Sequence, residues 1–104
     1  MSRWVRACGT GDVEEEDVIR WDHEGQTYAI YQSPENGFYA TEGMCTHEHT
    51  CLADGLVMGD IIECPKHNGR FNYKTGQAKG APVIVNLRTF PTRVEGDDVM
   101  VEID

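Results

Sequence analysis

The chain has 104 residues, which is enough for one domain but too few for a catalytic domain beside a separate metal-binding domain. Nine basic and eighteen acidic side chains give it a formal net charge of −9, which disfavours binding to nucleic acid or to an anionic membrane. The charge favours a basic protein partner reached by electrostatic steering, and acidity that only keeps the protein soluble explains it equally well.

Short runs of β-forming residues, separated by turn residues, predict a mainly β protein. The runs lie at residues 18–21, 27–31, 38–41, 92–95 and 99–103. Glu24 and Gly25 are expected to close the first two into a hairpin, and residues 96–98 the last two. Because no window of helical length has a 3.6-residue apolar period, we expect an all-β sandwich or barrel, with residues 1–104 as one domain.

The middle of the chain is different in composition. Residues 43–80 are rich in Gly, Cys, His and Asn, and only residues 60–63 are typical of a strand with a buried face. A long irregular stretch inside a compact domain is usually functional.

Two short motifs in this stretch carry metal-binding side chains. They are Cys45-Thr46-His47 and Cys64-Pro65-Lys66-His67, that is C-x-H, sixteen residues, and then C-x-x-H. Each motif supplies one thiolate and one imidazole, and two such loops at neighbouring strand ends can meet at one metal. Zinc would accept the same four ligands, although structural zinc sites more often pair like with like, so a zinc-stabilised Cys2His2 interaction module stays an alternative.

With this signature the sequence resembles the Rieske [2Fe–2S] family over nearly its whole length. The resemblance implies an antiparallel β-sandwich base with a small cluster-binding subdomain of two loops, at about residues 43–72. It also implies one Rieske [2Fe–2S] cluster per chain, with Cys45 and Cys64 on one iron and His47 and His67 on the other.

The function that the resemblance implies is electron transport and not catalysis. Free-standing members of this kind are ferredoxins that carry one electron from a flavin-dependent NAD(P)H reductase to a terminal Rieske non-haem iron oxygenase. A catalytic oxygenase subunit would need a second domain, and the small subunit of a nitrite reductase often lacks the four ligands that are present here. Residues 13–19, 47–49, 52–55 and 66–76 are similar to ferredoxins of rhizopine catabolism, whose oxygenase would demethylate an inositol-amine ether.

The neighbours of the second motif predict a low reduction potential. High-potential members of the family have a cysteine, a serine and a tyrosine where this chain has Lys66, Gly69 and Phe71. Without that cysteine and without the serine and tyrosine hydroxyls, we expect a potential near about −150 mV, the lower end of the Rieske range. Pro82 falls where the family has a proline loop over the cluster.

The remaining cysteines and histidines have simpler interpretations. We expect His49 to be an exposed residue at the loop tip, His23 a turn residue, Cys8 a small core residue and Cys51 a buried thiol without a disulfide. The first residues lack the apolar core of a signal peptide, and no apolar run is long enough to cross a membrane. We therefore expect a protein of the cytoplasm. Separately, we expect it to be a monomer.

Overall fold

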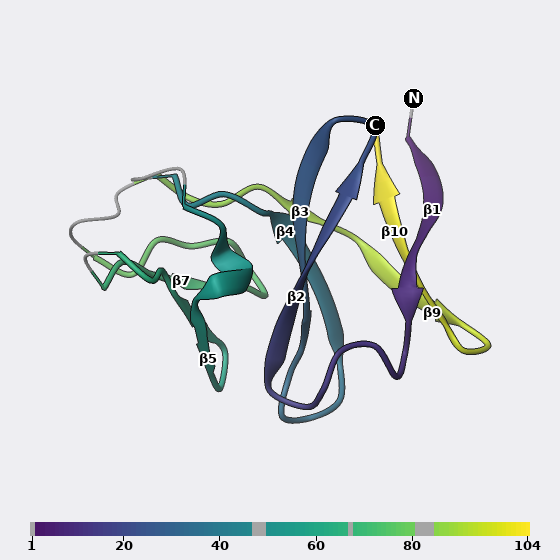
Figure 1. Cartoon of the computed structure of the whole chain (residues 1–104), viewed down its shortest axis with the longest axis horizontal. Coiled ribbons are helices and arrows are strands. Elements are labelled where there is room, and N and C mark those ends of the chain that lie inside the picture. Colours follow the sequence, from purple (N-terminus) through teal and green to yellow (C-terminus); the bar gives the residue numbers. More distant parts are fainter. Residues whose placement is uncertain (1, 47–49, 67, 81–84) are drawn as a thin grey trace.

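The computed structural model describes residues 2–46, 50–66, 68–80 and 85–104. These residues form ten β-strands and one 3₁₀ helix, arranged as a larger base and a smaller lobe beside it (Figure 1). The elements are β1 (Arg3–Gly9), β2 (Asp17–His23), β3 (Gln26–Gln32), β4 (Phe38–Glu42), η1 (Leu52–Asp54), β5 (Leu56–Met58), β6 (Ile61–Glu63), β7 (Arg70–Asn72), β8 (Thr89–Phe90), β9 (Thr92–Glu95) and β10 (Asp98–Ile103). No helix in the described part of the chain is long and apolar enough to span a bilayer.

The base consists of two antiparallel sheets. Strands β1, β10 and β9 form one sheet, and β2, β3, β4 and β8 form the other. One apolar cluster joins them, with Ile30 of β3 and Val99 and Val101 of β10 fully buried in it. The described residues therefore confirm the all-β sandwich that the sequence predicts.

Both predicted hairpins are present. In the first, His23 pairs with Gln26, and the two residues between them have positive φ angles, 50° at Glu24 and 79° at Gly25. Two consecutive left-handed residues match the twist of the flanking strands, as two-residue hairpin turns require. In the second hairpin β9 pairs with β10, and Gly96 begins the turn with a φ of 62°.

The smaller lobe has its own three-stranded sheet, in the order β5-β6-β7 (teal and green in Figure 1). Its core is continuous with one face of the base, because Val18 of β2 and Ala29 and Tyr31 of β3 belong to the same buried cluster. Tyr31 stacks on Tyr73 with ring centroids 4.6 Å apart, and both rings are fully buried. This stack fixes the lobe against the base.

Candidate metal centre

The first metal-binding motif begins where the chain leaves β4. Cys45 is only 1% exposed, and its N–H donates a hydrogen bond of 2.8 Å to the carbonyl of Thr50. One residue further out on each side, Met44 and Cys51 face each other in an antiparallel bridge. These contacts close residues 45–50 into a loop with a buried thiol at its root.

The second motif repeats this arrangement. Cys64 follows β6, is also 1% exposed, and donates its N–H to the carbonyl of Gly69 at 2.6 Å. Glu63 and Arg70, on either side, are paired in the β6–β7 ladder. Both loops therefore span the same number of residues and are closed by the same hydrogen bond, from a cysteine N–H to the carbonyl five residues later.

The structure brings the two predicted cysteines into one buried cluster. Cys45 and Cys64 both belong to the core of the small lobe, which also contains Leu52, Ile62 and Phe71. The predicted imidazole ligands, His47 and His67, lie outside the described residues. His49 and Pro82 lie outside them as well.

A glycine allows the two loops to approach each other. A Cβ atom on Gly55, which follows η1, would lie 2.1 Å from the carbonyl oxygen of Glu63, a distance that real Cβ atoms do not show. Only glycine lets the backbone after the first loop pass so near the strand that leads into Cys64. On the other side of η1, the N–H of Leu52 donates to the carbonyl of Gly43 at 2.8 Å and holds the root of the first loop.

The first loop has a further contact that the sequence does not reveal. The hydroxyl of Thr46, inside the C-x-H motif, donates a hydrogen bond of 2.8 Å to the carbonyl of Val85. The two residues are 39 positions apart, so no local pattern predicts this contact. It connects the segment after the small lobe to the loop that carries the C-x-H motif.

The chemistry of Cys45 and Cys64 suits a soft metal centre. Thiolates at such a position are ligands for iron–sulfur clusters, zinc or copper(I). Phe71 is fully buried, and Gly69 contributes only its backbone carbonyl to Cys64. The predicted positions of the potential-raising hydroxyls therefore carry none.

The other cysteines and His23 lie apart from this arrangement. No disulfide joins any of the four cysteines. Cys8 is buried on β1 in the core of the base, where burial raises the pKa of its thiol, and Cys51 is buried beside η1. The predictions for Cys8 and Cys51 are confirmed. His23 is the last residue of β2 and stacks on Trp21 with centroids 5.2 Å apart, so it flanks the turn and does not belong to it.

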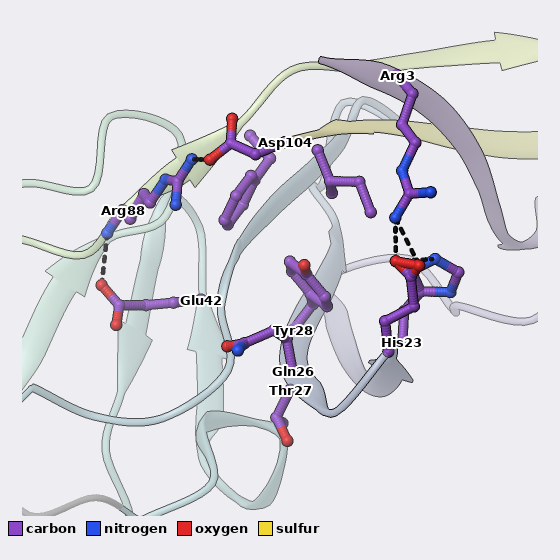
Figure 2. Close-up of a pocket in the computed structure, with 11 residues that line it drawn as sticks. Arg3, His23, Gln26, Thr27, Tyr28, Glu42, Arg88 and Asp104 are labelled. Atoms are coloured by element: carbon purple, nitrogen blue, oxygen red, sulfur yellow. Dashed lines mark hydrogen bonds and ion pairs between the residues drawn. The ribbon is translucent and has the colours of Figure 1, made fainter. Parts of the chain in front are cut away.

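A separate hollow of about 430 Å³ lies on the base, where the two chain ends meet (Figure 2). Its two arginines are already engaged by acids of the chain. Arg3 pairs with Glu24 near the start, and Arg88 pairs with Asp104 at the end and donates its backbone N–H to Glu42 at 2.7 Å. These pairs hold residues near both chain ends against the base, and both arginines of the hollow are already neutralised by acids of the chain.

Comparison with known proteins agrees with the motif. Residues 3–91 match the Rieske [2Fe–2S] domain family. A naphthalene 1,2-dioxygenase system ferredoxin component from Pseudomonas aeruginosa is 40% identical over 101 residues, which cover 97% of this chain and 96% of that protein.

Solved structures agree as well. A complex of reduced oxygenase and oxidized ferredoxin in carbazole 1,9a-dioxygenase contains a chain that is 36% identical, with a TM-score of 0.88 over 94% of this chain and 91% of that one. The Sphingomonas yanoikuyae B1 ferredoxin is 30% identical, with a TM-score of 0.91 over 98% of this chain and all of that one. A nitrite reductase small subunit from Mycobacterium tuberculosis shares the fold at a TM-score of 0.88, but at 15% identity it is similar in fold alone.

Proposed function

This chain belongs to the Rieske [2Fe–2S] family and is an electron-carrying ferredoxin, and from that premise we propose how it holds its cluster and which partners it serves. Cys45 and Cys64 would bind one iron of the [2Fe–2S] cluster, and His47 and His67 the other. The bound cluster supplies one-electron chemistry, so the chain itself needs no catalytic residue.

The observation that carries the ligand assignment is the matched closure of the two loops. Each loop has one buried cysteine at its root, and the N–H of that cysteine donates to the carbonyl of the residue five positions later. In the sequence, the histidine of the motif lies between these two residues. Two loops of equal span, rooted in one buried core, present two thiolates from similar positions.

The protein around the roots of the loops supports a low potential. Phe71 and the apolar lobe core exclude water from the two sulfurs, and neither Gly69 nor Phe71 brings a hydroxyl that would stabilise the added electron. We propose a potential near about −150 mV, at the low end of the family range. Such a carrier accepts electrons readily from a reduced flavin.

The partners that we propose are a flavin-dependent NAD(P)H reductase and a terminal Rieske non-haem iron oxygenase. Support comes from relatives that are ferredoxin components of naphthalene and biphenyl dioxygenase systems, and from the solved oxygenase–ferredoxin complex of the carbazole system. We further propose that the chain works as a monomer in the cytoplasm. From the similarity to ferredoxins of rhizopine catabolism we predict that the oxygenase substrate is an inositol-amine ether; this stays a prediction.

A rapid-mixing experiment tests the proposed electron transport. The reduced holoprotein is mixed without oxygen with its proposed partner, an oxidised terminal oxygenase from the same organism, and bleaching and recovery of the two visible spectra are followed. We expect one electron per chain to reach the oxygenase. Holoprotein that stays reduced beside a folded, oxidised oxygenase would contradict the proposal.

A further inference from the structure

Seven of the nine cationic side chains are paired with an acid of the same chain. The pairs are Arg3–Glu24, Arg6–Asp98, Arg20–Asp22, Arg70–Glu63, Lys74–Asp60, Arg88–Asp104 and Arg93–Glu95. The side chains of Lys66 and Lys79 form no ion pair or hydrogen bond with any described residue. In a chain with twice as many acids as bases, two lysines without an acidic partner among the described residues are unexpected.

Both unpaired lysines lie next to the second metal-binding loop. Lys66 is an exposed residue inside the loop, two positions after Cys64. Lys79 lies beside the strand that leaves the loop, where its N–H donates to the carbonyl of Arg70 at 2.9 Å. Lys79 and Arg70 also line an open hollow of about 380 Å³, together with Asn68, Gly80 and Glu63, the acid that pairs with Arg70. We call Lys66, Arg70 and Lys79 the loop patch.

The patch stands out against the charge of the whole chain. Residues 43–80 contain four of the nine basic residues and four of the eighteen acidic residues, so this segment is neutral. The other five basic and fourteen acidic residues carry the entire charge of −9. By this count, the segment that contains the second loop repels an acidic partner less than the rest of the chain does.

These lysines contribute little to the fold, because they are exposed and have no ion pair within the described parts of the chain. They become useful when carboxylates of another protein cover them and water is displaced. We propose that the loop patch docks onto carboxylate side chains of the terminal oxygenase. This inference rests on the proposed function, and the oxygenase is the occupant that we choose because a related ferredoxin is found in complex with one. This proposal differs from the expectation from net charge, because the net charge of the chain favours a basic partner surface and the loop patch requires an acidic one.

Charge variants of the holoprotein test the patch. We compare Lys79→Glu, and Lys66→Gln combined with Lys79→Glu, with Arg6→Gln, which removes an exposed cation of the base that is paired with Asp98. Affinity for the oxygenase that accepts electrons from the wild-type holoprotein is measured by calorimetry at low and high salt. Two irons per chain and an unchanged cluster spectrum verify each variant, and Lys79→Glu stays decisive even if a change at Lys66 disturbs the neighbouring histidine.

We expect the double variant to bind about tenfold more weakly at low salt, with a flatter salt dependence, and Arg6→Gln to change affinity less than about twofold. Unchanged affinity of Lys79→Glu, with wild type binding normally, would overturn the patch and leave the proposed function intact. If the patch variants react more slowly with the reductase but bind the oxygenase as wild type does, the oxygenase is not the occupant of the patch. Failure of the wild-type holoprotein to bind or reduce the oxygenase would overturn the proposed function itself, and the patch with it.

Discussion

Cys45 and Cys64 each begin one of the two closed loops, whereas Cys51 lies just after the end of the first loop. All three cysteines are buried. Replacing either root cysteine with serine exchanges a soft thiolate for a poor iron ligand. We expect Cys45→Ser and Cys64→Ser to lose at least about nine-tenths of the bound iron, because each removes one of four proposed ligands. Iron analysis and visible absorbance of the purified protein measure the loss.

Cys51→Ser is the matched control, since it changes a buried cysteine six residues from Cys45 and retains both proposed sulfur ligands. It should keep two irons per chain, as [2Fe–2S] stoichiometry requires. Equal loss of iron from Cys51→Ser and Cys45→Ser would contradict the ligand assignment.

Phe71 tests the argument about the potential. Its ring is fully buried in the cluster of side chains that contains both cysteines, at the position where high-potential relatives have tyrosine. Phe71→Tyr adds a hydroxyl donor, so we expect the potential to rise by tens of mV, on the order of the tuning that hydrogen bonds to cluster sulfurs provide. Redox titration measures it, with Phe90→Tyr on the base as the control. A potential that stays constant or falls in Phe71→Tyr would show that this position does not tune the cluster.

Gly55 determines how two elements pack, because its lack of a side chain lets the end of η1 lie close to β6. A Cβ atom there would lie 2.1 Å from the carbonyl of Glu63, whereas a Cβ atom on Gly11 would meet nothing within 4 Å. We expect Gly55→Ala to lower the free energy of unfolding by about 1–3 kcal/mol, as overpacking does, and Gly11→Ala to leave it nearly unchanged. Urea denaturation of the two holoproteins measures the difference, and equal stabilities would contradict the close approach.

The stack of Tyr31 on Tyr73 joins β3 of the base to the small lobe and gives stability a pH dependence. Burial raises the pKa of Tyr73 from an ordinary value of 10.0 to about 12, against the lowering effect of Lys74. Burial also raises the pKa of Tyr31. Below pH 10 both rings are protonated in the folded and unfolded states, so their contribution is complete.

Between pH 10 and about 12 the unfolded chain loses these protons before the folded chain does, so stability must fall as pH rises. Tyr73→Phe removes one of the two ionisable groups and should make the fall shallower. Thermal unfolding midpoints between pH 8 and pH 11.5, taken on wild type and variant, measure the two slopes. Parallel slopes would mean that Tyr73 keeps its ordinary pKa in the fold.

At the scale of the whole molecule, the base could be predicted from sequence and much of the small lobe could not. The β2–β3 hairpin follows from alternating apolar residues around Glu24 and Gly25, a local signal. Strands β5 and β7 have three residues each, too few to show a period, and packing against Tyr31 and its neighbours holds them in place. Their existence depends on contacts between distant parts of the chain.

The same distinction applies to the metal centre. The spacing of Cys45, His47, Cys64 and His67 identifies the candidate ligands, because ligand type and spacing are properties of the sequence. The equal closure of the two loops and the contact from Thr46 to Val85 are long-range or three-dimensional features that no spacing reveals. Likewise, only the structure shows that Lys66 and Lys79 have no acidic partner among residues 2–46, 50–66, 68–80 and 85–104, whereas each of the other cations has one.

The most direct test of the proposed cluster is pulsed electron paramagnetic resonance of the dithionite-reduced protein, with iron and zinc quantified on the same sample. We predict two irons per chain, a rhombic signal, and coupling to two imidazole nitrogens that disappears in part when His47 or His67 is replaced. Stoichiometric zinc without iron in well-folded protein, persisting after anaerobic reconstitution, would contradict the electron-carrier function and indicate a zinc-stabilised module instead.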